Sequence, residues 1–270
     1  MGTKIESKGQ LAVVTGASTG IGFELAKVFA KNGFDLLVTA ENDQIQIAAK
    51  DFRALGVSVQ VVQTDLARPD GSGVDELYST IKTLGRPVDC IAINAGVGVG
   101  GEFITNNFQA ELNLMQLNII SLVHLTKHVL RDMVSVGRGK ILFTSSIAGE
   151  MPGPYYAVYA ASKAFVQSFS EAIRYEVKDK GVSVTALQPG ATDTPFFARA
   201  GMLDTKAGAS KKDSPAEVAQ QGFDALMAGR DHVVAGSLLN NVQSGVAKII
   251  SEKQAAGLHA KQTKPGSGRN

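Results

Sequence analysis

Short apolar runs of strand length recur along the chain, at residues 11–15, 34–40, 57–63, 88–94, 139–145 and 182–189. Between them, apolar residues recur at helical spacing over residues 23–32, 44–55, 75–84, 109–136 and 155–180. Strands that alternate with helices, without tight hairpin turns, predict a parallel sheet covered on both faces. The pattern therefore predicts an α/β fold with a single doubly wound Rossmann-type parallel sheet and helices on both faces.

The regular alternation ends after the last of these runs. Residues 191–213 mix aromatic, small and charged side chains without periodicity, which is typical of a lid over a site or of a disordered insert. Ser214, Pro215 and Glu217 then predict a capping box with proline in the first turn of a helix. We expect this helix to end at about Met227.

The remaining residues predict a short C-terminal extension of the same unit. Residues 232–235 indicate a last edge strand, and an amphipathic helix is expected from beyond Leu238 to about Leu258. The polar tail at 261–270 is expected to be disordered. With no internal repeat visible, we expect residues 1–260 to form a single domain.

Composition and charge exclude several classes of protein. A hydrophobic content of 44% allows a large core, and a net charge of +2 with interspersed signs argues against a nucleic-acid or membrane-surface protein. The single cysteine, Cys90, lies in an apolar run, so we expect a buried thiol and no intramolecular disulfide. The N-terminus lacks a hydrophobic signal region and no apolar stretch approaches membrane-span length, so a cytoplasmic location is expected.

A glycine-rich turn, TGASTGIG at residues 15–22, follows the first strand and opens the first helix. Gly16 allows the turn, Gly20 lets the backbone approach a pyrophosphate, and Gly22 permits close packing. Glu41, at the end of the second strand, is placed to accept hydrogen bonds from ribose hydroxyls and would repel a 2′-phosphate. The turn predicts a dinucleotide site, and Glu41 favours NAD over NADP as its ligand. The alternative is that Glu41 is exposed and contacts no ligand.

Tyr159 and Lys163 lie one helical turn apart, and Ser146 lies at the end of a strand. A free phenol titrates near about 10, so it needs a nearby cation to exchange protons at neutral pH. Lys163 shares the helix face with Tyr159, and its charge is expected to lower the phenol's pKa. Ser146 offers a hydroxyl beside the phenol, an arrangement that suits acid–base chemistry on an alcohol or carbonyl. Most Tyr–Lys pairs at this spacing are ordinary solvated contacts, so the catalytic interpretation of this pair depends on the other motifs.

Five motifs follow one another along the chain: the turn at 15–22, the NAG at 94–96, Asn118, the Ser146–Tyr159–Lys163 set and the Pro-Gly at 189–190. Their identity and order resemble those of the classical short-chain dehydrogenase/reductases. The resemblance runs from about Leu11 to Thr194. It implies a catalytic tetrad in which Tyr159 is the acid/base and Ser146 positions the substrate oxygen. In the same family pattern Lys163 binds the nicotinamide ribose, and Asn118 holds a water in a proton relay.

The resemblance and the glycine-rich turn together imply a set of cofactor contacts. These are Gly16, Ser18, Thr19, Gly20, Ile21, Gly22, Glu41, Asp65, Leu66, Asn94, Ala95, Gly96, Tyr159, Lys163, Pro189, Gly190, Thr192 and Thr194. Many NADP-dependent members carry a basic residue at one of the places that hold Thr19 and Glu41 here, which again favours NAD. The usual NAD-selecting aspartate of the family is replaced by Ala40, which leaves the preference open.

Several residues compete for these roles. Tyr155, Tyr156 and Tyr175 lie on or near the same helix as Tyr159, and only Tyr159 has both a lysine four residues later and a serine at a preceding strand end. Ser145 is the alternative to Ser146 as the serine that positions the substrate oxygen, and the spacing to Tyr159 favours Ser146.

Two further groups have more than one interpretation. His124 and His128 have i,i+4 spacing, but with no third ligand evident no metal site is expected, and they are interpreted as helix-surface or interface residues. Phe196, Phe197 and Met202 are expected either to cap a hydrophobic substrate or to pack onto the core.

These observations predict an NAD(P)-dependent oxidoreductase that interconverts a secondary alcohol and a ketone by hydride transfer, with Tyr159 as general acid/base. A cofactor-binding regulatory protein, or a lyase or epimerase on the same scaffold, is the alternative. The expected partner is a small-molecule carbonyl or alcohol, recognised by residues 97–103, 148–156 and the segment after Pro195. Nucleic acid and membrane are not expected as partners. The family resemblance also implies a homotetramer or homodimer.

Overall fold

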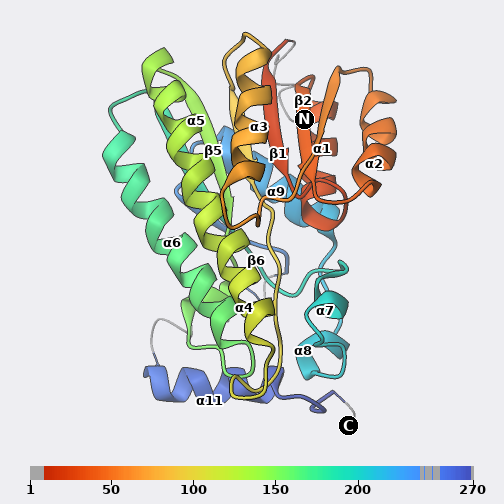
Figure 1. Cartoon of the computed structure of the whole chain (residues 1–270). Helices are drawn as coiled ribbons and strands as arrows, with labels where there is room; N and C mark the ends of the chain where they lie inside the picture. Colours follow the sequence, from red (N-terminus) through yellow and green to blue (C-terminus); the bar gives the residue numbers. More distant parts are fainter. Residues whose placement is uncertain (1–8, 238–239, 241–244, 246–249, 269–270) are drawn as a thin grey trace.

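The computed structural model describes residues 9–237, 240, 245 and 250–268, and at its centre lies a seven-stranded sheet (Figure 1). The strands are β1 (Leu11–Thr15), β2 (Asp35–Ala40), β3 (Val59–Gln63), β4 (Cys90–Ile93), β5 (Gly139–Thr144), β6 (Val182–Pro189) and β7 (His232–Ala235). Every neighbouring pair is parallel, in the order β3-β2-β1-β4-β5-β6-β7. The predicted α/β fold is confirmed, and the strand order reverses between β1 and β4, where such sheets bind ligands.

Helices cover both faces of the sheet (Figure 1). The main ones are α1 (Gly20–Lys31), α2 (Gln44–Arg53) and α9 (Pro215–Met227) on one face, and α3 (Ser72–Thr83), α5 (Leu122–Val136) and α6 (Ala157–Val177) on the other. Each face has its own hydrophobic cluster, and every residue of β1 is buried. Burial on both faces explains why the strands appear in the sequence as continuous apolar runs.

The helix expected over residues 109–136 is interrupted. It consists of α4 (Phe108–Met115), a π-helical turn η1 (Gln116–Ser121) and α5, which ends at Gly137 in the left-handed region with φ +74°. A π-turn holds one residue more than an α-turn and is often found at functional sites. Hydrophobic spacing does not reveal such an insertion, because the apolar pattern continues through it.

The segment expected to lack regular structure, residues 191–213, contains two short helices. They are α7 (Phe196–Arg199) and α8 (Lys206–Ala209), and an isolated parallel bridge joins Thr192 to Asp213 at the ends of the segment. The following helix, α9, begins at Pro215 as predicted. The predicted capping box is wrong, because Ser214 makes no side-chain cap and its carbonyl instead accepts the first helical hydrogen bond, from the Val218 N–H at 3.1 Å.

The C-terminal residues differ most from expectation. Strand β7 occupies the predicted positions, but residues 238–239, 241–244 and 246–249 of the next expected helix lie outside the described residues. The described helix α11 (Glu252–Thr263) starts at a capping box between Ser251 and Gln254. It extends past Leu258 and runs across the lower end of the molecule, where it packs near α8 (Figure 1).

The expectation of a disordered tail is wrong for residues 261–268. After α11, the Gly266 N–H donates to an Asp204 carboxylate oxygen at 2.9 Å and the Gly268 N–H donates to the Asp204 carbonyl at 2.8 Å. The Ser267 hydroxyl accepts from the Lys206 N–H at 2.9 Å. These hydrogen bonds attach a polar, glycine-rich segment to the start of α8, which composition alone does not indicate.

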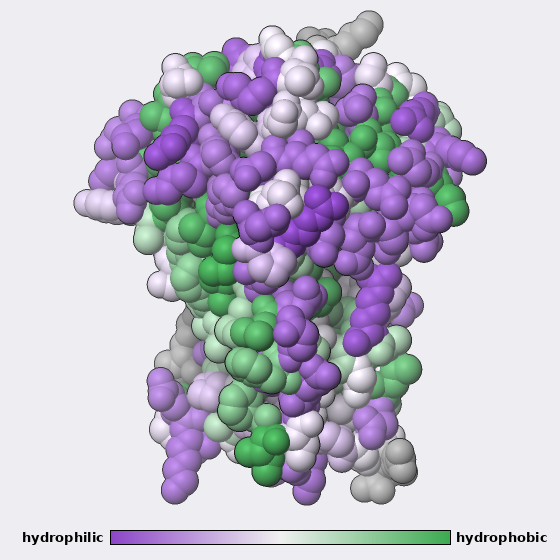
Figure 2. Space-filling view, in the orientation of Figure 1, coloured by the Kyte–Doolittle hydropathy of each residue, from purple (hydrophilic) through white to green (hydrophobic). Residues whose placement is uncertain are grey.

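Hydrophobic side chains gather on the narrow lower part of the face shown in Figure 2, whereas the broad upper part is mostly hydrophilic. The exposed large side chains of α4 and η1 include Phe108, Leu112 and Ile120. The homo-oligomer expected from the family resemblance stays a prediction. Within the described part of the chain, no helix combines the length and apolarity needed to cross a bilayer.

Candidate active site

A cavity of about 620 Å³ lies at the carboxyl ends of the strands. With two exceptions, Gly22 and Asn118, every residue predicted to be catalytic or to bind the cofactor lines this cavity. One end is formed by the turn after β1 and the end of β2, and the other by α6, α7 and α11. The topology thus brings together residues as far apart in the sequence as Gly16 and Thr263, at the carboxyl edge of a doubly wound sheet where ligands bind.

The glycine-rich turn is shaped to admit a phosphate. A Cβ on Gly16, whose φ is +66°, would lie 2.9 Å from the Ala95 Cα, and one on Gly22 would collide with the Gly16 carbonyl. Helix α1 starts here, and its N-cap residue Thr19 makes no side-chain hydrogen bond to the first turn. The N–H groups of that turn therefore remain able to bind an anion, and the residues present fit a dinucleotide pyrophosphate.

The end of β2 provides polar groups at the far side of this turn. Glu41 is exposed and lines the cavity, together with Asp65 from the segment after β3. The neighbouring Asn42 was not among the predicted contacts, yet its Oδ1 is buried without a hydrogen-bond partner and it lines the same cavity. Buried polar atoms are rarely left unsatisfied, so this oxygen marks Asn42 as a further candidate contact for a ligand.

Asn94 connects three neighbouring strands below the cavity. The Thr15 hydroxyl accepts hydrogen bonds from the N–H groups of Asn94 and Ala95, each at 3.0 Å. The Asn94 side chain donates to the Thr15 carbonyl at 3.2 Å and accepts from the Thr144 hydroxyl at 3.1 Å. The ends of β1, β4 and β5 are therefore fixed to one another, and with them the NAG turn.

Asn118 lies in the π-turn, buried behind the cavity wall. Its Oδ1 accepts from the Val97 N–H, and its amide donates to the Val97 carbonyl and to the Ser162 hydroxyl, at 3.0 to 3.1 Å. Both side-chain donors are used, so the side chain holds the loop after β4 against α6.

The two adjacent serines have different surroundings. The Ser145 hydroxyl donates to the Lys163 carbonyl at 2.9 Å, which ties β5 to α6. Ser146 accepts from the Ala148 N–H at 3.1 Å, donates to the Pro189 carbonyl at 3.3 Å, and hydrogen-bonds to the Tyr159 side chain. Ser146 is thus the serine that lies beside the phenol.

Tyr159 and Lys163 are both buried, with the Lys163 Nζ 5.7 Å from the centre of the Tyr159 ring. Burial raises the pKa of Tyr159 to about 12, and the hydrogen bond to Ser146 partly offsets this increase. Burial lowers the pKa of Lys163 to about 8, and its ammonium donates to the Thr144 carbonyl at 2.8 Å. The lowering of the phenol's pKa expected from Lys163 is outweighed in this arrangement, because removal from water dominates and the net change in the pKa of Tyr159 is a rise.

The other tyrosines take different positions. Tyr175 is 72% exposed, and Tyr155 lies just before α6 with φ +64°. Tyr156 is buried and stacks on Tyr159, with ring centres 5.6 Å apart. Of the four, Tyr159 is the one hydrogen-bonded to Ser146.

The sequence analysis missed His259, which reaches the cavity from α11. Its Nδ1 lies 3.0 Å from the Pro152 carbonyl, which can only accept, so Nδ1 carries the proton and Nε2 accepts from the Tyr156 hydroxyl. Burial lowers the pKa of His259 and keeps the ring neutral. A second bond, from the Thr263 hydroxyl to the Pro154 carbonyl at 2.8 Å, attaches α11 to the same loop. These contacts could not be predicted from the sequence, because the residues that they join lie more than 100 positions apart.

The side of the cavity next to Tyr159 is largely apolar. Phe197 and Met202 are buried in a cluster with Tyr156 and Tyr159, and the Phe196 ring lies 5.0 Å from the Tyr159 ring. All three predicted apolar residues also line the cavity. They pack onto their neighbours, as one of the two interpretations expects, and their contact with a substrate stays a prediction.

Comparison with known proteins agrees with this geometry. Residues 10–202 match the family model described as short chain dehydrogenase. The chain is 35% identical to mouse 17-beta-hydroxysteroid dehydrogenase type 3 over 71% of its length, but the match spans only 63% of that protein. It is 30% identical to oxidoreductase UcpA of Salmonella typhimurium, covering 91% of this chain and 92% of the other.

Among solved structures, a short-chain dehydrogenase from Sphingobium yanoikuyae in complex with NADPH is similar over 92% of this chain and 98% of its own. The TM-score is 0.78 and the sequence identity 27%. Its likeness extends over nearly the whole fold, and the family match spans the glycine-rich turn, the NAG turn and the Ser–Tyr–Lys set. The chain belongs to the short-chain dehydrogenase/reductase family of oxidoreductases.

Proposed function

We propose that this protein interconverts a secondary alcohol and a ketone, with NAD(P) as the hydride carrier. The observation that carries the proposal is the position of Ser146 and Tyr159 in the wall of a cavity that continues to the glycine-rich turn. A carbonyl oxygen placed between the two hydroxyls would face a proton donor at one end of a dinucleotide-sized groove. General acid–base chemistry requires this arrangement.

Each residue has a separate task in the proposed reaction. The cofactor, when bound, supplies or accepts the hydride. In the reductive direction the carbonyl carbon gains that hydride, and Tyr159, protonated at neutral pH because of its raised pKa, donates its proton to the oxygen. Ser146 holds the oxygen by a hydrogen bond. Lys163 stabilises the phenolate that remains until the proton is replaced.

The apolar lining favours a bulky, apolar ketone as substrate. Phe196, Phe197 and Met202 offer no hydrogen bonds, so binding at this side would come from burial of apolar surface. The mouse relative's name, a hydroxysteroid dehydrogenase, is consistent with a substrate of this kind. A regulatory protein without turnover, and a lyase or epimerase, are the competing functions, and neither would oxidise NADH or NADPH when supplied with ketones.

We propose NAD as the preferred cofactor because of Glu41. A carboxylate can accept hydrogen bonds from the adenosine ribose hydroxyls but repels a 2′-phosphate. The Sphingobium structure contains NADPH, which shows that the fold also admits the phosphorylated form. The choice therefore depends on the side chains at the end of β2.

Replacement of Tyr159 by Phe should lower kcat on the order of 100- to 10,000-fold, because only the proton-transferring oxygen is lost. The measurement is steady-state oxidation of NADH and NADPH across a panel of ketones, with cofactor binding followed by fluorescence. Tyr175→Phe, on the exposed side of the same helix, is the matched control and should keep wild-type rates. Activity of Tyr159→Phe within a few-fold of the wild type would refute the role of Tyr159, and a wild-type enzyme inactive on every ketone would refute the function.

Lys163 should make the stability of the protein depend on pH. Its folded pKa of about 8 lies below its ordinary value of 10.5, so between these values the unfolded chain binds a proton that the folded chain lacks. The free energy of unfolding should therefore rise with pH in this window, by on the order of 3 kcal/mol in full. Lys163→Met should lose this rise, whereas Lys180→Met, at an exposed position, should keep it. Denaturant titrations between about pH 7.5 and 10 test this, and parallel curves for wild type and Lys163→Met would contradict it.

His259→Ala should raise the KM for bulky ketones and leave the KM for the cofactor unchanged. The substitution removes the hydrogen bond that holds Tyr156 beside Tyr159, and loss of one such bond corresponds to a change of about 2- to 10-fold. Lys253→Ala, on the exposed side of α11, is the matched control. If both variants had the wild-type KM for the substrate, α11 would not form part of the substrate site.

Glu41→Arg should shift the ratio of kcat/KM toward NADPH by about tenfold or more, since arginine binds the phosphate that glutamate repels. The wild type should prefer NADH in side-by-side titrations of both cofactors. Asp43→Arg, two residues further on, introduces the same charge outside the cavity lining and serves as the control. A wild-type preference for NADPH that Glu41→Arg leaves unchanged would show that another residue, such as Asn42 or Ser18, reads the ribose.

A further inference from the structure

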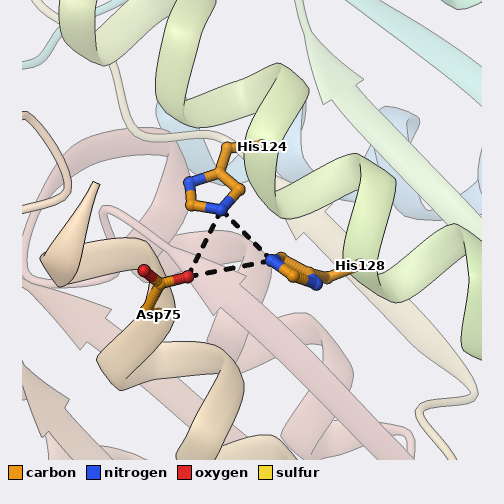
Figure 3. Close-up of side chains that lie close together, drawn as sticks. All are labelled: Asp75, His124 and His128. Atoms are coloured by element: carbon orange, nitrogen blue, oxygen red, sulfur yellow. Dashed lines mark hydrogen bonds and ion pairs between the residues drawn. The ribbon is translucent and has the colours of Figure 1, made fainter. Parts of the chain in front are cut away.

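The two histidines of α5 meet a carboxylate from α3, outside the residues that line the cavity (Figure 3). His124 and His128 point their Nε2 atoms toward each other at 3.1 Å. Asp75 Oδ1 lies 3.3 Å from the first and 3.8 Å from the second. The third ligand, absent from the sequence pattern, is thus supplied by a neighbouring helix.

We propose that Asp75, His124 and His128 form a binding site for a borderline divalent cation such as Zn²⁺. Zinc binds imidazole nitrogen and carboxylate oxygen at about 2.0–2.2 Å, which places the ligands of a tetrahedral ion about 3.3–3.5 Å apart. The three distances between the donor atoms, 3.1, 3.3 and 3.8 Å, lie around that value. A single ion could therefore contact all three atoms with only small side-chain adjustments.

Hydrogen bonding alone does not satisfy this cluster. If both Nε2 atoms carried protons, two N–H groups would face each other at 3.1 Å. If only one Nε2 carried a proton, that N–H could donate to only one of the two other atoms of the cluster. The lone pairs that received no proton would then face each other. One cation accepts all three lone pairs at once.

Both rings are held in position by other contacts. The His128 ring stacks on Tyr78, with centres 4.2 Å apart and planes 19° from parallel. The His124 ring packs against Gly71 at the start of α3, where a Cβ would lie 3.2 Å from the ring.

The proposed site has an open side. The Asp75 side chain is 60% exposed, so a water can complete the tetrahedron from solvent. The ion would link α3 to α5, which continues directly from the π-turn that contains Asn118. We therefore expect the bound ion to stabilise the folded chain without taking part in the chemistry of Tyr159.

The test is titration of tag-free, chelator-treated protein with ZnCl₂ by isothermal calorimetry, together with melting curves with and without the ion. One ion should bind per chain and raise the Tm, and MgCl₂ should do neither, because magnesium prefers oxygen ligands. His128→Ala and Asp75→Asn should each raise the Kd for Zn²⁺ at least tenfold. His232→Ala, a histidine outside the cluster, should leave the Kd unchanged.

A second measurement guards against variants that fold poorly. Co²⁺ added to the wild-type protein should give the visible absorption of a tetrahedral nitrogen–oxygen site, and excess Zn²⁺ should remove it. Absence of zinc binding to the wild type would overturn the proposal. Equal Zn²⁺ affinity in the wild type and in folded Asp75→Asn and His128→Ala proteins would also overturn it, because the ion would then bind elsewhere.

Discussion

The site depends on a chain of hydrogen bonds that runs across the carboxyl edge of the sheet. Thr15 holds the NAG turn, Asn94 joins the strands on either side of it, and Thr144 passes the connection to Lys163 through its carbonyl. All of these groups lie at strand ends or on the first turns of α6. Because buried polar groups must keep their partners, a displacement at one strand would leave others unsatisfied, so the cavity beside the glycine-rich turn and helix α6 are positioned together.

The fold could be predicted from the sequence because its signals are local and repeated. Each strand buried on both faces gives a continuous apolar run, and even the short strand β7 was placed at its correct residues. The π-turn at Gln116–Ser121 could not be predicted in this way, since one extra residue in a helix leaves the apolar pattern nearly unchanged. The position of residues 261–268 also escaped prediction, because their hydrogen bonds to Asp204 and Lys206 involve main-chain groups that carry no sequence signal.

The candidate site, like the fold, has some features that the sequence predicts and others that it does not. The glycine-rich turn and the set of Ser146, Tyr159 and Lys163 are visible in the sequence because they are particular residue types at fixed spacings along the chain. The protonation of Tyr159 and Lys163 was not predictable, since it depends on how far each is removed from water by the surrounding chain. His259 and Asp75 were missed because a partner on another helix is found only when the fold brings the helices together.

Helix α11, which forms part of one side of the cavity, lies wholly beyond the residues that match the family model. The glycine-rich turn, Tyr159 and the first six strands belong to the matched part of the chain, whereas β7 and this wall of the cavity lie outside it. Mutations in α11 can reshape the cavity without disturbing the hydrogen bonds at the strand ends. A fold organised in this way can acquire new substrates through its C-terminal segment while its catalytic machinery is inherited unchanged.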